Sequence, residues 1–150
     1  MKKFLLSVVI GFGAYTSVNA QCVINTTYTI PGYYPDTITN LPFAYVATPY
    51  ATDLQFKVKP DTTTMAGTFP IQQIAIDSVV GMPAGFSYIP NPGSGVFPGG
   101  SNGCVYISGN PTSGQELGGP ANDGVYPITV YFTATVLVFT LPVTSPGTQP

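Results

Sequence analysis

The sequence contains no histidine, no tryptophan and no arginine, and its only glutamate is Glu116. Without histidine, the chain cannot form a Ser-His-Asp or Cys-His catalytic arrangement or any metal site that needs an imidazole ligand. A pair of carboxylates, as used by glycosidases, is the arrangement that this composition still allows. Because Glu116 lies in a glycine-rich loop with nothing to suit it to acid catalysis, we predict that the chain is not an enzyme and has no catalytic residues.

Charged residues make up only 7% of the chain. All four basic residues are lysines, namely Lys2, Lys3, Lys57 and Lys59. Binding to a phosphate backbone requires clustered lysine or arginine side chains. We therefore predict that nucleic acid is not a partner.

What the sequence does contain is typical of strands. The 150 residues suit a single domain, and 44% of them are hydrophobic, including 10 tyrosines and 9 phenylalanines. Aromatic and β-branched residues favour a pleated surface, and the 17 glycines and 16 prolines punctuate the chain between short apolar runs. This combination predicts an all-β fold.

Residues 1–20 have the features of a secretory signal peptide. Lys2 and Lys3 precede an apolar run, and a small-residue motif ends at Ala20, which predicts cleavage between Ala20 and Gln21. One alternative is a transmembrane anchor, although the run is short and contains glycines. Another is a lipoprotein attached through Cys22, but Gln21 is poorly suited to precede a lipidated cysteine. We expect a protein that is secreted or on the cell surface, exported through the periplasm, whose mature form does not span the membrane.

The sequence has two cysteines, Cys22 and Cys104. In an oxidising compartment an even number of cysteines favours a disulfide. The alternatives are two independent thiols, or a free Cys22 near the new N-terminus. We predict a Cys22–Cys104 disulfide.

Alternation of apolar and polar residues predicts the main strands. In residues 53–59, Leu54, Phe56 and Val58 share one face, and in residues 105–108 the same holds for Val105 and Ile107. The longest run, residues 126–138, places Ile128, Val130 and Phe132 on one face, and we expect a bend or bulge near residues 135–137. Further strands are predicted at residues 25–30, 71–80 and 86–88, with Ile74, Ile76 and Val80 on one face of the second.

The connecting segments are predicted from turn residues. Residues 33–41 are expected to be irregular or to form an edge segment, and residues 61–70, 90–103 and 112–124 are expected to be loops. We predict a signal peptide over residues 1–20, a folded domain over residues 21–144, and a linker or truncated end over residues 145–150.

About seven strands with turns between them predict an immunoglobulin-like antiparallel β-sandwich with Greek-key connections. Whether its last strand is present stays open at this point. The stretches GMPAGFSY (81–88), GCVYISGNPT (103–112) and GVYPITVYFTATV (124–136) resemble the immunoglobulin-like, cadherin-like domain of bacterial surface proteins. That resemblance implies a module in a larger extracellular protein.

The chain also resembles the N-terminal region of proteins that Bacteroidetes export by type IX secretion. The resemblance lies in Cys22, in YPDT (34–37), in PYATDLQF (49–56) and in FPGGSNGC (97–104). Relatives often carry a further cysteine pair in the segment equivalent to residues 89–95, which has none here. The resemblance implies surface anchoring by a sorting tail, but the sequence has no such tail.

Two classes of non-catalytic function follow from these features. The first is a spacer, adhesion or accessory module whose partners are other domains of the same secreted protein or a surface protein or glycan. The second is a carbohydrate-binding module that uses tyrosine rings as stacking faces. The candidate tyrosines are Tyr33, Tyr34, Tyr45, Tyr50, Tyr88, Tyr106, Tyr126 and Tyr131, although tyrosines on strands commonly serve packing.

No cofactor is predicted, and calcium is the one candidate ion. Calcium needs six to eight oxygen ligands from clustered acidic residues. The acidic residues of the chain are scattered, and Asp123 is typical of a turn residue. They are Asp36, Asp53, Asp61, Asp77, Glu116 and Asp123.

Overall fold

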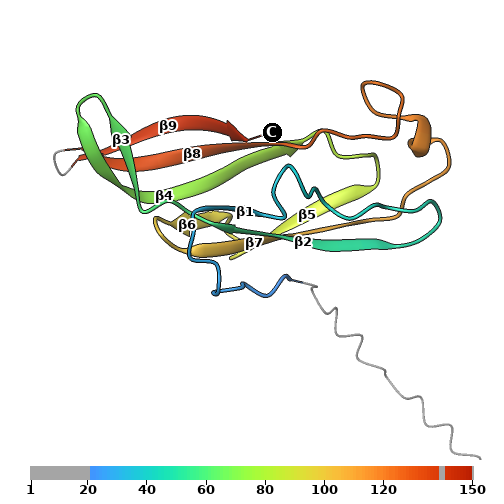
Figure 1. Cartoon of the computed structure of the whole chain (residues 1–150), viewed down its shortest axis with the longest axis horizontal. Helices are drawn as coiled ribbons and strands as arrows, with labels where there is room; N and C mark the ends of the chain where they lie inside the picture. The colour runs from blue at the N-terminus through green and yellow to red at the C-terminus, as the bar shows by residue number, and fades with distance from the viewer. Residues whose placement is uncertain (1–20, 139–140, 150) are drawn as a thin grey trace, which may run out of the picture.

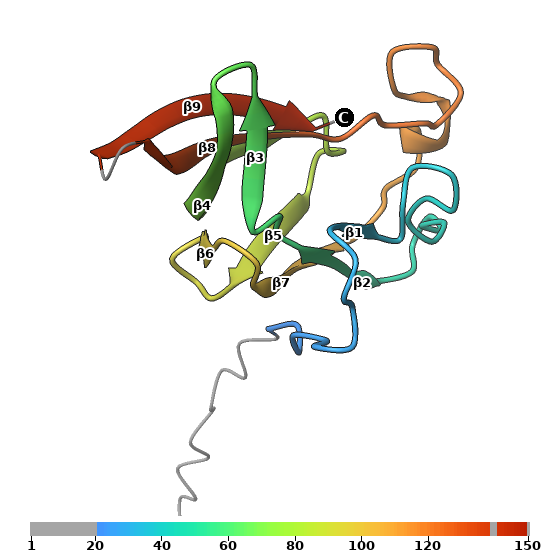
Figure 2. The same ribbon diagram turned by 60° about the vertical axis from the view of Figure 1, so that its left-hand side comes forward.

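A computed structural model describes residues 21–138 and 141–149, of which the side chains are described up to residue 138. The predicted signal peptide, with Ala20, lies outside the described residues. The described chain forms nine strands in two antiparallel sheets that face each other (Figures 1 and 2). The strands are β1 (Gly32–Tyr34), β2 (Tyr50–Lys57), β3 (Asp61–Thr64), β4 (Gly67–Val80), β5 (Phe86–Asn91), β6 (Val96–Pro98), β7 (Asn102–Gly109), β8 (Thr129–Val138) and β9 (Leu141–Gln149).

The strand order within the sheets is that of an immunoglobulin constant-type sandwich. One sheet has the order β1-β2-β7-β5, and the other has β4-β8-β9 with β3 and β6 added along the free edge of β4. Taken in chain order, the seven main strands reproduce the A-B-E-D and C-F-G sheets of that fold. The predicted immunoglobulin-like fold is therefore confirmed, with β3 and β6 as short additions to it.

The last strand of the fold is present. β9 pairs with β8 from Val130 opposite Gln149 to Val138 opposite Leu141. Residues 145–149, which we predicted to be a linker after a domain ending at residue 144, belong to this strand, and Pro150 lies outside the described residues. Pro146 and Gly147 favour a linker, but a residue without an amide hydrogen is tolerated in an edge strand such as β9, which also contains Pro142.

The predicted strand at residues 25–30 does not form. The Asn25 side-chain oxygen accepts hydrogen bonds from the Thr27 backbone amide (3.0 Å) and the Thr27 hydroxyl (2.7 Å). Such local bonds compete with ladder formation, so the segment turns. The first strand is instead β1, which starts at Gly32 and lies at an edge of its sheet, as expected for part of residues 33–41.

Two predicted loops contain strands. Residues 61–70 form the β3–β4 hairpin around Met65 and Ala66, and the Thr63 and Thr68 hydroxyls across it are 3.0 Å apart. Its threonine-rich strands are mostly exposed on both faces, so they lack the apolar alternation that marks a strand. Within residues 90–103, the three residues of β6 pair with β4, and β7 already begins at Asn102.

Two bulges in β4 change which of its side chains face inward. The register shifts between Ile76 and Ser78, so the alternation reverses, and Val79 is half-buried while Val80 is 46% exposed. The predicted inward position of Val80 is therefore wrong. A second shift, between Ile71 and Gln73, lies opposite Thr135 and Val136, so the irregularity that we expected in β8 near these residues is carried by its partner strand.

The predicted long strand begins later than expected, at Thr129. Tyr126 stays in the preceding loop, where its hydroxyl donates to the Gln115 carbonyl oxygen at 3.0 Å. Pro127 follows it and has no amide hydrogen for a ladder. Ile128, Val130 and Phe132 are half-buried.

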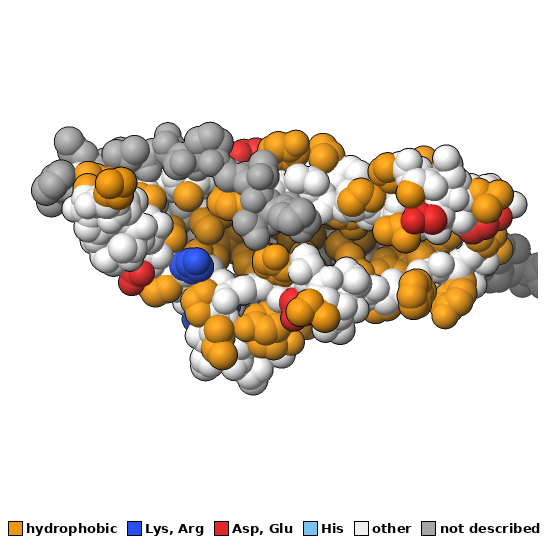
Figure 3. All heavy atoms as spheres, turned by 45° about the horizontal axis from the view of Figure 1, so that its top comes forward, with side chains coloured by type: hydrophobic (Ala, Val, Ile, Leu, Met, Phe, Trp, Pro, Cys, Tyr) orange, Lys and Arg blue, Asp and Glu red, His pale blue; other side chains and the backbone are white. Residues whose placement is uncertain are grey.

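The most deeply buried side chains gather where β6 and β7 meet the end of β2. Phe97 is 1% exposed, and its ring meets that of Phe56 edge to face with centroids 4.7 Å apart. A Cβ atom at Gly103 would lie 2.6 Å from the Phe97 ring, so glycine is required there for the close approach. Val58 follows β2 at this end, and Val105 and Ile107 continue the buried inner face of β7; each of the three is at most 5% exposed. Elsewhere the layers enclose half-exposed apolar residues, and Figure 3 shows hydrophobic side chains in the furrow between them.

Candidate interaction surfaces

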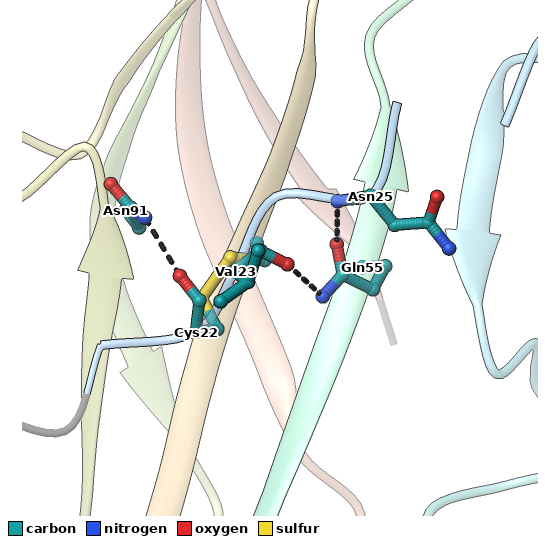
Figure 4. The surroundings of a disulfide bond; sticks show 6 residues. Cys22, Val23, Asn25, Gln55 and Asn91 are labelled. Atoms are coloured by element: carbon teal, nitrogen blue, oxygen red, sulfur yellow. Dashed lines mark hydrogen bonds between the residues drawn. A yellow bond between two sulfur atoms is a disulfide. The ribbon is translucent and has the colours of Figure 1, made fainter. Parts of the chain in front are cut away.

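The predicted disulfide between Cys22 and Cys104 is present (Figure 4). Cys104 lies on β7 opposite Gln55 of β2 and Asn91 of β5, on the outer face of that sheet. A sulfur atom in a disulfide cannot also carry a lipid, and in the described chain neither cysteine is free. The lipoprotein and free-thiol alternatives are therefore inconsistent with this bond.

The disulfide and three outward-facing amide side chains hold the N-terminal segment across one half of this outer face. Asn91 donates to the Cys22 carbonyl oxygen (2.7 Å), and Gln55 donates to that of Val23 (3.0 Å) while accepting from the Asn25 amide (3.0 Å). Figure 4 shows these bonds on both sides of the disulfide. Asn102 donates to the carbonyl oxygens of Asn25 and Tyr28. This half of the face is thus covered by the protein itself.

The other half of the same face is open and contains a shallow groove. Its lining includes Ala51 of β2, Ser108 of β7 and Ser87 of β5, which lie side by side in register, and a volume of about 360 Å³ lies above them. Tyr106, half-buried, stands in the next row between Asp53 and Ile89. We call this the outer groove. Here the structure brings a tyrosine from the sequence-based candidates next to a hollow in an open sheet face.

The other candidate tyrosines are used mainly within the protein. Tyr34 stacks on Tyr28 with ring centroids 3.9 Å apart, and Tyr50 packs against Phe86 at 5.6 Å. Tyr33 lies in β1 opposite Phe56, and Tyr88 lies in β5 opposite Ile107. Tyr45 and Tyr131 are 69% and 43% exposed, on a loop and on β8. Sequence reasoning missed Ala51, Ser87 and Ser108, since only strand pairing places these three small residues in one row.

A second surface lies at the end of the sandwich where β2 begins. The loop of residues 35–49 and the loop of residues 110–128 meet there, joined by a hydrogen bond from the Ala47 amide to the Pro111 carbonyl oxygen (3.0 Å), and Figures 1 and 2 show both at this end. Together they expose large apolar side chains, which we call the apolar loop end. These are Phe43 (86% exposed), Tyr45 (69%), Val46 (42%), Leu117 (69%) and Val125 (63%).

Charge is distributed unevenly between the two ends. Glu116 and Asp123 lie on the apolar loop end. Lys57 is the last residue of β2 and Lys59 follows it, at the opposite end. The Lys57 ammonium group donates to the Gly100 carbonyl oxygen at 2.6 Å. The apolar loop end therefore carries negative charge without a lysine.

Several acidic residues serve local structure. Asp36 accepts hydrogen bonds from the amides of Thr39 (2.8 Å) and Ile38 (3.1 Å), and these bonds, first those from Thr39, lower the pKa of its carboxyl. Asp123 accepts from the Val125 amide in a turn, as expected, and Glu116 accepts from the Gly114 amide. Asp77 accepts from the Thr133 hydroxyl. In the part of the chain that the structure describes, no three His, Cys, Asp or Glu side chains lie together as a metal ligand set would.

Within residues 21–138 and 141–149, no helix has the length and apolar character needed to cross a bilayer. The sequence matches no protein-family model, no curated protein and no solved structure.

Proposed function

We propose that the chain is a non-catalytic extracellular module of a secreted or cell-surface bacterial protein, where it serves as a spacer, adhesion or accessory domain. The observation that carries the proposal is the apolar loop end. Soluble domains rarely expose five large apolar side chains on adjoining loops unless another surface covers them. The signal-peptide pattern of residues 1–20 and the disulfide suit an oxidising compartment.

The occupant of the apolar loop end is another protein domain, either of the same secreted protein or on the cell surface. Glu116 and Asp123 lie among the apolar side chains, so a complementary partner carries lysine or arginine around an apolar centre. An anionic lipid surface would be repelled by the same carboxylates. Resemblance to Bacteroidetes type IX proteins is the basis for proposing a multidomain surface protein as the context.

Export is tested by producing residues 1–150 in a Gram-negative host and measuring the intact mass of the protein outside the cytoplasm. The proposal expects a chain that begins at Gln21 and is two hydrogens lighter than its reduced form. A chain that keeps residues 1–20 and stays reduced in the cytoplasm contradicts the extracellular role.

Partner contact is tested with a photo-crosslinking residue at position 43 in the secreted protein. The matched control carries the same residue at Met65, which is fully exposed on the β3–β4 turn at the opposite end. The proposal expects crosslinks to another domain or protein from position 43 alone, weakened when Glu116 and Asp123 are replaced by lysine. Equal crosslinking from both positions contradicts it.

A second candidate function is carbohydrate binding, and the outer groove favours it. An aromatic ring beside a polar, lysine-free hollow has the chemistry of a sugar site. The groove would give the same extracellular module a ligand of its own.

A further inference from the structure

We infer that the outer groove is a binding site for a neutral sugar ring, with Tyr106 as its stacking residue. The inference rests on the proposed extracellular role, because glycans are ligands that such a module meets outside the cell. It adds to that role a defined site, a chemical class of ligand and a residue on which binding depends.

The shape of the site comes from the size of the side chains in one row. Ala51, Ser108 and Ser87 lie opposite one another on three neighbouring strands, so the hollow is about 10 Å wide at a strand spacing of about 4.8 Å. Glycine and small residues continue it past Gly109 towards Asn110 and Pro49. Tyr106 is one row away, about 7 Å along the strand, and lines the hollow. A sugar ring fits in the space beside this aromatic side chain, whereas larger side chains in the row would fill it.

The groove and the row beside it carry polar side chains that form no bonds within the part of the protein that the structure describes. Among the described residues, no hydrogen bond, ion pair or ring contact is formed by the side chains of Tyr106, Asp53, Ser87 or Ser108. These groups contrast with Gln55, Asn91 and Asn102 on the covered half of the same face, which all bind the N-terminal segment. The open half thus offers hydroxyls, which can donate and accept hydrogen bonds, and a carboxylate, which can accept them from the hydroxyls of a sugar.

The charge of the groove selects among sugars. Asp53 is the charged residue beside it, and the nearest lysine on the same face of β2, Lys57, is two rows beyond Asp53 and bonded to Gly100. A carboxylate without a neighbouring cation repels uronic acids, sialic acids and phosphates. The ligand is therefore a neutral hexose or pentose unit, presented by a chain or by a surface glycan.

The experiment is a titration of the purified 15N-labelled protein with cellohexaose, xylohexaose, mannohexaose and chitohexaose, followed by NMR. Polygalacturonate serves as the anionic probe. We expect at least one neutral oligosaccharide to shift the amides of Ser87, Tyr106 and Ser108 and to bind with a measurable Kd. Tyr106→Ala should weaken this binding about tenfold or more, because aromatic residues at the centre of a site carry much of its affinity. Tyr106→Phe should keep most of it.

Two further variants separate the groove from general effects of tyrosine. Ser108→Val fills the hollow while Tyr106 stays, and should weaken binding. Tyr131→Ala, which removes a 43% exposed tyrosine from β8 in the other sheet, should leave the Kd unchanged.

Three outcomes would overturn the inference. They are no binding of any neutral oligosaccharide at millimolar concentration, equal losses in Tyr106→Ala and Tyr131→Ala, and a preference for polygalacturonate. Each would leave the export and crosslinking results unaffected, so failure of the sugar site is distinguishable from failure of the extracellular role.

Discussion

Gly81 turns the chain from β4 towards β5, which lies in the other sheet. Its φ of +88° is strained for any residue with a side chain, and an added Cβ atom would overlap the Pro127 carbonyl oxygen. Gly85, four residues later, has a similar φ of +82° but no atom within 4 Å of an added Cβ. The two glycines therefore differ only in the space around them.

We expect Gly81→Ala to lower the free energy of unfolding by about 3 kcal/mol or more, because backbone strain and an overlap act together. Gly85→Ala, the matched control, should cost about 1 kcal/mol, from the left-handed backbone alone. Urea unfolding followed by circular dichroism measures both. Equal losses would show that the Pro127 carbonyl moves aside freely.

Asp36 gives a prediction about pH. The amides of Thr39 and Ile38 donate to its carboxylate and lower its pKa below that of the unfolded chain. The unfolded state therefore binds the proton first as pH falls. The stabilisation from this turn is present above the ordinary aspartate pKa of 3.8 and is lost as pH falls through the lower folded value.

Asp36→Asn keeps an oxygen that can accept both hydrogen bonds but cannot titrate. We expect the variant to show a shallower loss of stability below about pH 4 than the parent protein does. Urea unfolding at a series of pH values measures the slope, and NMR titration of the Asp36 carboxyl measures the pKa directly. An unshifted or raised pKa would contradict the assigned role of these hydrogen bonds.

At the scale of single elements, β6 has a larger role in the core than its three residues suggest. It places Phe97 between the layers, where the ring is 1% exposed against Phe56 and directly above Gly103. We expect Phe97→Ala to cost about 3–5 kcal/mol, the range for removing a buried aromatic ring. Phe43→Ala removes the same group from a side chain that is 86% exposed and should change stability by less than about 0.5 kcal/mol. Similar losses in the two variants would mean that β6 does not anchor the core.

The elements that could be predicted from the sequence are strands with one side facing solvent and the other side facing the opposite sheet. β2, β4, β7 and β8 show apolar alternation because one side of each faces the opposite sheet. The strands that could not be predicted lack this contrast. β3 is mostly exposed on both faces, β6 has only three residues, and β9 carries prolines that an edge strand tolerates. The alternation in β4 also misled us at Val80, because a bulge at Asp77 cannot be read from residue types.

At the scale of the whole molecule, the sequence was enough for the layer architecture but not for the surfaces. Tyr106 and Ser108 could be assigned to the outer face of one strand, since Val105 and Ile107 alternate with them. Ala51 and Ser87 precede Ser108 by 57 and 21 residues in the chain and become its neighbours only through the order β2-β7-β5. The apolar loop end likewise depends on two distant loops meeting. Both candidate surfaces are properties of topology, and local patterns do not encode them.

Removing the Cys22–Cys104 disulfide shows how much it contributes to the stability of this fold. It closes a segment with a sequence separation of 82, which spans β1 to β6 and the start of β7. In the chain-entropy model such a loop stabilises the folded state by about 4 kcal/mol. We expect Cys22→Ala/Cys104→Ala to lose a comparable amount, measured by urea unfolding against the oxidised parent. Alanine is the suitable replacement, because a serine hydroxyl at the buried position 104 would add a desolvation cost of its own.

Hydrogen exchange in the same variant shows which parts of the protein lose stability. Asn91, Gln55 and Asn102 still bond to the N-terminal segment in the variant, but without the disulfide these hydrogen bonds have to order the segment alone. We expect the amides of the paired strands β4 and β8 to exchange faster by the factor that the lost unfolding free energy sets, because they open only when the whole domain unfolds. The Asn25 amide, which donates to the Gln55 side-chain oxygen, should exchange at a lower free energy than these strands, because the untied segment can detach by itself. If Asn25 exchanged at the same free energy as β4 and β8, the N-terminal segment would not be a separate layer on the outer face.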